Sequence, residues 1–228
     1  MSAVTDARSS RRRKFFALAA GGALVVTGVG YTLASWTDTE WVFGGAGDGT
    51  PALGTSRFEV EQNVTAPFDP AGFVQRETNP GQPLGFDLGA LALSPGDAVY
   101  ADVALRTTSD SLAGDVLLQP AVPSASSTAV DPGDALWGAL RLRVATTASA
   151  SAACDVTAFA GPGVVVDGPL ATTGATAAQT LAARSGSLQA YCFEVSLPAS
   201  PALPTGVALD ALQGRTVAPA WQFAAESD

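Results

Sequence analysis

The chain has no histidine among its 228 residues, and this absence removes several classes of enzyme. Catalysis by a triad of serine, histidine and aspartate, or by a cysteine and histidine pair, needs an imidazole as general base. Zinc proteases with an H-E-x-x-H helix need two imidazoles as metal ligands. The only two cysteines, Cys154 and Cys192, do not make a zinc site by themselves. We therefore expect a protein that is not an enzyme and that holds no cofactor and no metal ion.

Basic residues are scarce, and most of the chain is strongly acidic. Twelve basic residues face twenty-one acidic ones, which gives a formal net charge of −9. Lys14 is the only lysine, and five of the twelve basic residues lie at or before it. Such a surface repels the phosphate backbone of nucleic acids and anionic membranes, and it keeps the chain soluble. We expect no nucleic acid partner.

Carboxylates are abundant, and two pairs of them are candidates for chemistry. Glu59 and Glu61 share one face of an expected strand, while Asp131 and Asp134 lie in a Pro-Gly turn. Two carboxylates held across a cleft could hydrolyse a glycoside, and turn aspartates could bind calcium. In an acidic chain such pairs also arise by chance, and we interpret the turn aspartates as solvated residues. A secreted hydrolase is therefore the weakest of the functions considered.

The cysteines predict a disulfide and an oxidising compartment. An even number of cysteines in an exported chain indicates one bond, here between Cys154 and Cys192. Closing a loop of this length would restrict the unfolded chain by roughly 3–4 kcal/mol. The alternative is a pair of free buried thiols. A redox role is disfavoured because the two residues lack C-x-x-C spacing.

The N-terminus predicts a signal peptide over residues 1–35. A basic cluster at residues 11–14 precedes an uncharged, glycine-containing apolar run from Phe15 to Leu33, and small residues follow it. We expect a signal peptidase to cut after Ala34 or Ser35, so that the chain meets the membrane only through the signal helix before cleavage. A retained anchor is the alternative, because about 20 apolar residues can span a bilayer. The Arg12-Arg13 pair leaves a twin-arginine route open beside the general one.

An acidic and aromatic arm, residues 36–54, follows the expected cut. Its N-terminal part is followed by a glycine-rich stretch that predicts a flexible joint. An extended arm could add as a strand to a sheet edge of a neighbouring subunit, and head-to-tail addition of that kind gives fibres. The alternatives are that the arm packs against its own domain or serves only as a recognition element for the peptidase. The residues that would form this assembly arm are Trp36, Asp38, Glu40, Trp41 and Phe43.

The remaining residues, 55–228, predict an all-β domain. Short runs with apolar residues at every second position alternate with clusters of proline, glycine, aspartate and serine. Two low-complexity stretches, 121–128 and 171–183, are expected to be a loop and a loop or short helix. The strands would pack as two antiparallel sheets, a jelly-roll-like β-sandwich. The expected strands are 58–61, 99–105, 116–118, 140–144, 164–166, 191–197, 207–212 and a last one that contains Trp221 and Phe223.

Residues 12–47 resemble a particular kind of export signal. The glycine-containing apolar run, the motif L-A-S-W-T-D-T-E at residues 33–40 and the sequence F-G-G-A-G at residues 43–47 carry the resemblance. They are similar to the alternate-type (SipW-class) signal peptide of TasA-like and camelysin-like secreted proteins of high-GC Gram-positive bacteria. The resemblance implies a jelly-roll domain and assembly into fibres through the N-terminal arm. Camelysin-like proteins also imply a metallopeptidase, but this chain has no zinc ligand set to support that activity.

These observations favour a non-enzymatic protein that is secreted or held at the cell surface. Its first candidate role is that of an extracellular matrix subunit that assembles by N-terminal strand addition. The alternative is a soluble secreted binding module, for instance one for cell-wall glycan. Against that alternative, aromatic residues are few, and Tyr100, Trp137 and Trp221 fit a core better than a binding platform.

Overall fold

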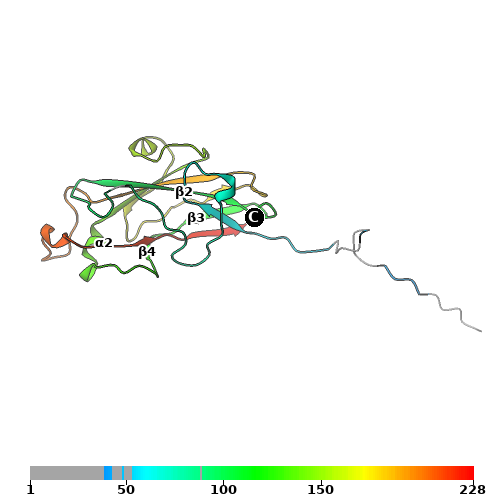
Figure 1. Cartoon of the computed structure of the whole chain (residues 1–228), viewed down its shortest axis with the longest axis horizontal. Coiled ribbons are helices and arrows are strands. Elements are labelled where there is room, and N and C mark those ends of the chain that lie inside the picture. Colours follow the sequence, from blue (N-terminus) through cyan, green and yellow to red (C-terminus); the bar gives the residue numbers. More distant parts are fainter. Residues whose placement is uncertain (1–38, 43–47, 49–52, 88) are drawn as a thin grey trace, which may run out of the picture. The chain divides into compact units, whose positions relative to one another are not determined.

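The computed structural model describes residues 39–42, 48, 53–87 and 89–228. The chain divides after Gly54, and Thr55–Asp228 form one compact unit (Figure 1). The predicted signal peptide, with its cleavage residues Ala34 and Ser35, lies outside the described residues, and so do Trp36, Asp38 and Phe43 of the assembly arm.

Five antiparallel strands form the larger sheet of this unit. Successive side chains of a strand point to opposite faces, so apolar residues at every second position form one apolar row on the face that packs on the core. β8 lies between β2 and β5, so the central strands are not neighbours in the sequence. Such a crossed connection is a feature of jelly rolls. The order across the sheet is β1 (Val60–Asn63), β2 (Ala98–Thr107), β8 (Gln189–Ser196), β5 (Arg141–Thr147) and β6 (Val164–Pro169).

A smaller antiparallel sheet forms the second layer. Its strands are β10 (Phe223–Ser227), β3 (Gly114–Leu118) and β7 (Gln179–Leu181), in that order. A short ladder of β4 (Val122–Pro123) with β9 (Pro219–Ala220) continues the β3–β10 pair. The backbone N–H of Gln119 donates to the carbonyl of Gln222 at 2.8 Å and joins the two ladders. The predicted two-sheet antiparallel sandwich is therefore confirmed.

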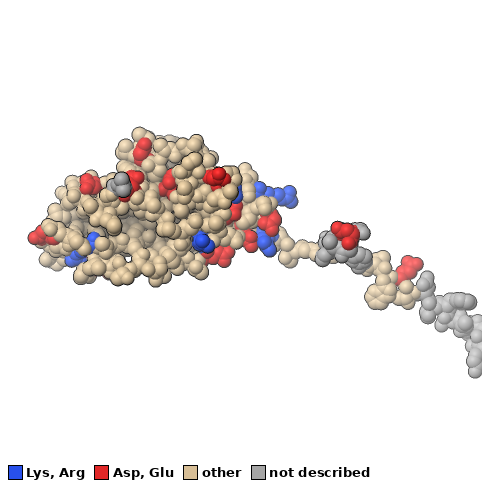
Figure 2. Space-filling view, in the orientation of Figure 1, with Lys and Arg blue, Asp and Glu red and all other residues tan. Residues whose placement is uncertain are grey.

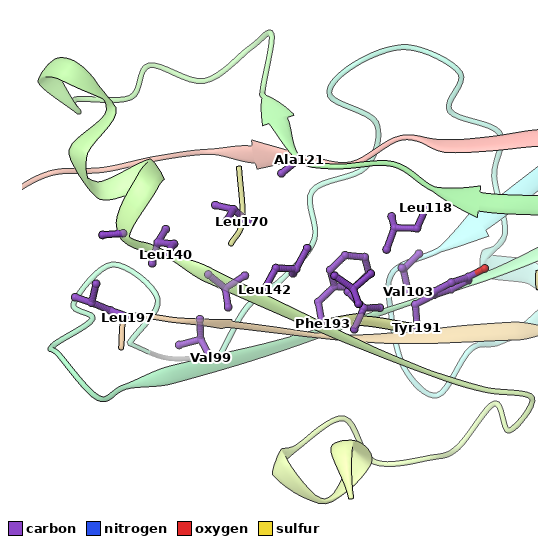
Figure 3. Packing of buried hydrophobic residues seen from close by; sticks show 14 of the residues in the cluster. Val99, Val103, Leu118, Ala121, Leu140, Leu142, Leu170, Tyr191, Phe193 and Leu197 are labelled. Atoms are coloured by element: carbon purple, nitrogen blue, oxygen red, sulfur yellow. The ribbon is translucent and has the colours of Figure 1, made fainter. Parts of the chain in front are cut away.

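The main core lies between the two sheets (Figure 3). Leu142, Tyr191 and Phe193 project from the larger sheet, and Leu118 meets them from the smaller one. Tyr191 packs edge-on against the Phe223 ring, with 4.9 Å between the ring centroids. Both rows of residues predicted to face the core are buried: Leu140, Leu142 and Val144 on one strand, and Tyr191, Phe193, Val195 and Leu197 on the other.

Some expectations about local structure were wrong. Residues 207–212 do not form a strand but end in a 3-10 turn, η4 (Leu209–Leu212), because their backbone N–H groups bond to carbonyls three residues earlier, Ala211 to Ala208 and Gln213 to Asp210. The low-complexity stretch 121–128 contains β4, and 171–183 contains β7. Few helical elements are described elsewhere; they are η1 (Pro70–Gly72), η2 (Pro132–Asp134), α2 (Ala135–Ala139) and η3 (Val156–Phe159).

The outer face of the larger sheet is covered rather than exposed to water. Cys192 and Glu194 point away from the main core, as the alternation predicts, yet only 7% and 6% of their surfaces are exposed. The segment from residue 148 to residue 163, which includes η3, packs over them, and Phe159 at its centre is buried. In Figure 3 this turn lies on the side of the sheet away from the core residues. The sandwich therefore carries a partial third layer.

Candidate functional site

Two regions of the molecule carry the candidate sites, the N-terminal arm and the outer face of the larger sheet. Of the arm, residues 39–42, 48, 53 and 54 are described; Thr39–Val42 have no regular secondary structure, and Glu40 is exposed. Trp41 and Val42 are 90% and 96% exposed. The strand-like alternation proposed for the arm stays a prediction, since most of its residues are not described.

The smaller sheet ends at β10, which supplies an edge of the kind that strand addition needs. β10 pairs with β3 in register from Phe223 opposite Leu118 to Ser227 opposite Gly114. Within the described part of the chain, β10 has no strand on its other side. An edge strand leaves every second N–H and C=O without a partner in the sheet. The β1 edge of the larger sheet differs, because Gln62 exchanges two backbone hydrogen bonds of 2.9 Å with Val74.

The disulfide pairs Cys154 with Cys192, as the sequence predicts. Cys192 belongs to the central strand β8, and Cys154 to the covering segment 148–163. The bond therefore fastens this segment across the middle of the sheet. A disulfide of this kind indicates folding in an oxidising environment, such as the outside of the cell.

A cavity of about 340 Å³ lies between the sheet and the covering segment, beside the disulfide. Five of the residues that line it are alanines, so much of its wall is apolar. Thr147 and Thr157 add hydroxyl groups, and Asp102 is the only charged residue in the lining. Sequence reasoning missed this site. Cys154 and Phe159 inside an otherwise featureless alanine-rich segment were the only signal that it folds back on the sheet.

Most carboxylates on the outer face are paired with arginines. Glu61 bonds the Arg106 guanidinium at 2.6 Å, and Arg141 donates to Asp167 at 3.0 Å. Glu194 lies 3.4 Å from Arg143. The same arginine stacks its guanidinium over the ring of Phe159, 4.5 Å from the centroid, and so the covering segment is held by charge and aromatic contact as well as by the disulfide.

Asp102 is the exception on this face. It lies opposite Cys192 in the register of β2 with β8. No arginine or other cation pairs with it among the described residues. Burial raises the pKa of the Asp102 carboxyl, a hydrogen bond from its own backbone N–H opposes the shift, and the charge of Asp87 adds to it. The cavity therefore contains a carboxyl group that has no counterion among the described residues.

Three of the four carboxylates singled out in the sequence contact arginines, and the fourth, Asp134, is exposed as a solvated turn residue would be. Glu59 contacts Arg57 at 3.6 Å while Glu61 bonds Arg106, so the two glutamates face different cations. Asp131 is not a solvated turn residue, because its side chain is only 5% exposed and bonds Arg215 at 2.8 Å. It also accepts hydrogen bonds from the backbone N–H groups of residues 136 and 137.

The hydrogen bonds to Asp131 favour the ionised form of its carboxyl group. Burial opposes its ionisation, but the hydrogen bonds from Arg215, Leu136 and Trp137 outweigh that effect and hold the pKa of the carboxyl below its usual range. The carboxylate thus accepts from two N–H groups in the first turn of helix α2 and is the partner of Arg215. Within the described residues, no group of three or more cysteines or acidic residues is placed to hold a metal ion.

Charge elsewhere on the domain is sparse. Figure 2 shows acidic side chains scattered over the visible face among mostly uncharged residues, with few basic ones between them. In the described part of the chain, no helix is long and apolar enough to cross a membrane. Comparisons with known protein families and with curated proteins found no match to this chain.

Proposed function

We propose that this protein is a secreted, non-enzymatic protein of the cell surface or extracellular matrix, and that its N-terminal arm adds as a strand to a neighbouring subunit. The single observation that carries the proposal is the exposure of Trp41 and Val42, at 90% and 96%. Adjacent large apolar side chains that are this exposed are unfavourable in water, and we infer that a partner covers them.

The β10 edge of the domain is the proposed receiving surface. The β10 edge offers unpaired backbone groups from Phe223 to Ser227. Strand addition uses such groups for affinity and the alternate side chains of the incoming strand for specificity. Because the arm and the receiving edge are different surfaces of the same chain, addition is head-to-tail and extends into a fibre.

The arrangement of the carboxylates supports a non-enzymatic role. Glu61 and Asp131 bond arginines at 2.6 and 2.8 Å. The pKa of the Asp131 carboxyl is lowered, whereas a general acid needs a raised pKa. The half-buried Trp137 and Trp221 pack against the main core and do not form an aromatic platform for a glycan.

The test compares two chains purified with the disulfide intact. One begins at Trp36, the other at Gly44, so that they differ only in the arm. Light scattering over time and electron microscopy of the endpoint should show filaments for the first chain and monomers for the second.

Single substitutions sharpen the result. Trp41→Ser should slow assembly strongly because it removes the exposed aromatic anchor. Val156→Ser is the matched control, since Val156 is also an exposed apolar residue, at 63%, but lies in η3. Filaments from the chain that begins at Gly44 would refute strand addition by the arm. A chain from Trp36 that stays monomeric would refute the fibre role and leave a soluble binding protein.

A further inference from the structure

The cavity beside the disulfide has a charge pattern that the proposed assembly does not use. Four carboxylates project from the strands of the outer face: Glu61, Asp102, Asp167 and Glu194. Three of them contact an arginine at 2.6, 3.0 and 3.4 Å. Asp102 alone faces the cavity, and there it contacts no cation of the described chain.

An unpaired, half-buried carboxylate is unfavourable unless a positive group meets it. Moving a charge out of water costs free energy that a partner of opposite sign recovers. The other carboxylates of this face have such partners within the domain. The carboxylate of Asp102 lacks one because its neighbours in the cavity are alanines, threonines and the disulfide. A positive group on another molecule would supply the missing partner.

We propose that this cavity binds a primary ammonium group carried on a slender alkyl chain, with Asp102 as its counterion. Five alanines give the cavity apolar walls that suit methylene groups. An ammonium has three donors, which the carboxylate and the hydroxyls of Thr147 and Thr157 can accept.

Other ligand classes fit the cavity less well. A divalent cation needs several oxygen ligands with charge, and Asp102 is the only carboxylate in the lining. A quaternary ammonium needs an aromatic cage. Tyr191 lines the cavity, but its ring packs on the core side against Phe223 at 4.9 Å. An anion would be repelled by the carboxylate.

The sequence also limits the source of the ligand. Lys14 is the only lysine in the chain and precedes the predicted cleavage site, so a copy cut there would carry no lysine side chain. The ligand is therefore a different molecule, such as a small alkylamine or a lysine-bearing peptide.

The experiment titrates pentylammonium into the isotope-labelled chain that begins at Trp36 and follows amide signals by NMR. Saturable shifts should map to the cavity, around residues 102, 147, 157 and 192. The same titration with 1-pentanol tests the charge, because the alcohol has the same shape. Loss of one charged hydrogen bond predicts roughly ten- to hundredfold weaker binding for the alcohol.

Two variants test whether the charge of Asp102 is needed for binding. Asp102→Asn should weaken pentylammonium binding by a similar factor, about ten- to hundredfold. Asp167→Asn is the matched control, because it removes the same charge from the same face but lies outside the cavity lining. It should bind like the wild type.

A third variant covers the case in which Asp102→Asn fails to fold. Ala152 is exposed at the wall of the cavity, so Ala152→Leu should fill the space without disturbing the core and should abolish binding. Equal binding by Asp102→Asn and the wild type, equal binding by Ala152→Leu and the wild type, or shifts spread over all surface carboxylates would overturn the proposal.

Discussion

Removing the disulfide should destabilise the domain by an amount that the length of its loop sets. The bond joins residues 38 positions apart. The chain-entropy relation for a loop of this length gives a stabilisation of about 4 kcal/mol at 25 °C. For a domain of this size that corresponds to a fall in melting temperature of roughly 8–16 °C.

The variant to measure is Cys154→Ala combined with Cys192→Ala. Its unfolding in guanidinium chloride can be followed by the fluorescence of Trp137 and Trp221, which are half-buried against the core. Without the cross-link the unfolded chain expands, and the denaturant slope should rise together with the loss of stability.

Wild-type protein with its disulfide reduced is the control. It lacks the cross-link but keeps both sulfur atoms in the covering segment and the sheet. If loop entropy is the main cause, the reduced protein and the alanine variant should lose similar free energies of unfolding. A loss of less than about 1 kcal/mol in both would contradict the loop-entropy reasoning, and a much greater loss in the variant alone would assign the effect to packing.

Three further outcomes follow from the buried ion pair and the crowded core. Arg215→Leu should lower the free energy of unfolding by about 3–5 kcal/mol, because it leaves the Asp131 carboxylate buried without a partner. Arg141→Leu breaks an exposed ion pair and should change the free energy of unfolding by less than about 1 kcal/mol. Denaturant titrations of the two variants in parallel make the comparison. Because the pKa of Asp131 is lowered in the folded state, ionised Asp131 contributes fully to the stability of the fold above the ordinary pKa of about 3.9. This stabilisation should be lost as pH falls through the lower folded pKa. Thermal melts of the wild type at acid pH should show the loss, and melts of Arg215→Leu should show less of it. Gly114→Ala should destabilise by about 1–3 kcal/mol, seen as a lower melting temperature, because the new methyl group would meet the carbonyl oxygen of Glu226.

The alternation of apolar residues predicted the sandwich because each sheet turns its apolar row toward the core between the two sheets. Leu140 to Val144 and Tyr191 to Leu197 show a strict period of two, and the structure places both rows in the core. The pairing of the cysteines followed from their number alone. These features depend on local pattern or on counting, and a single sequence supplies both.

The covering segment and the cavity beneath it could not be predicted in the same way. Residues 148–163 are mostly small and show no period, so their packing depends on tertiary contacts of Phe159 and Cys154 with strands far along the chain. The unpaired state of Asp102 became visible only when every arginine of that face was placed. The burial of Asp131 was missed for the same reason, since its partner Arg215 lies 84 residues away.

The position of β8 between β2 and β5 has a consequence for the order in which the domain can fold. β2 pairs with β8 from Ala98 opposite Ser196 to Leu105 opposite Gln189. These contacts join parts of the chain that are far apart in the sequence. Chains rich in such contacts fold slowly, because the entropy of loop closure is lost before the contacts can stabilise the fold. A chain that emerges from its N-terminus cannot complete its central sheet until residue 196 is available. Fragments that end earlier would leave β2 without its partner strand β8. Because Cys192 lies in β8, the disulfide with Cys154 can form only after this strand has been synthesised.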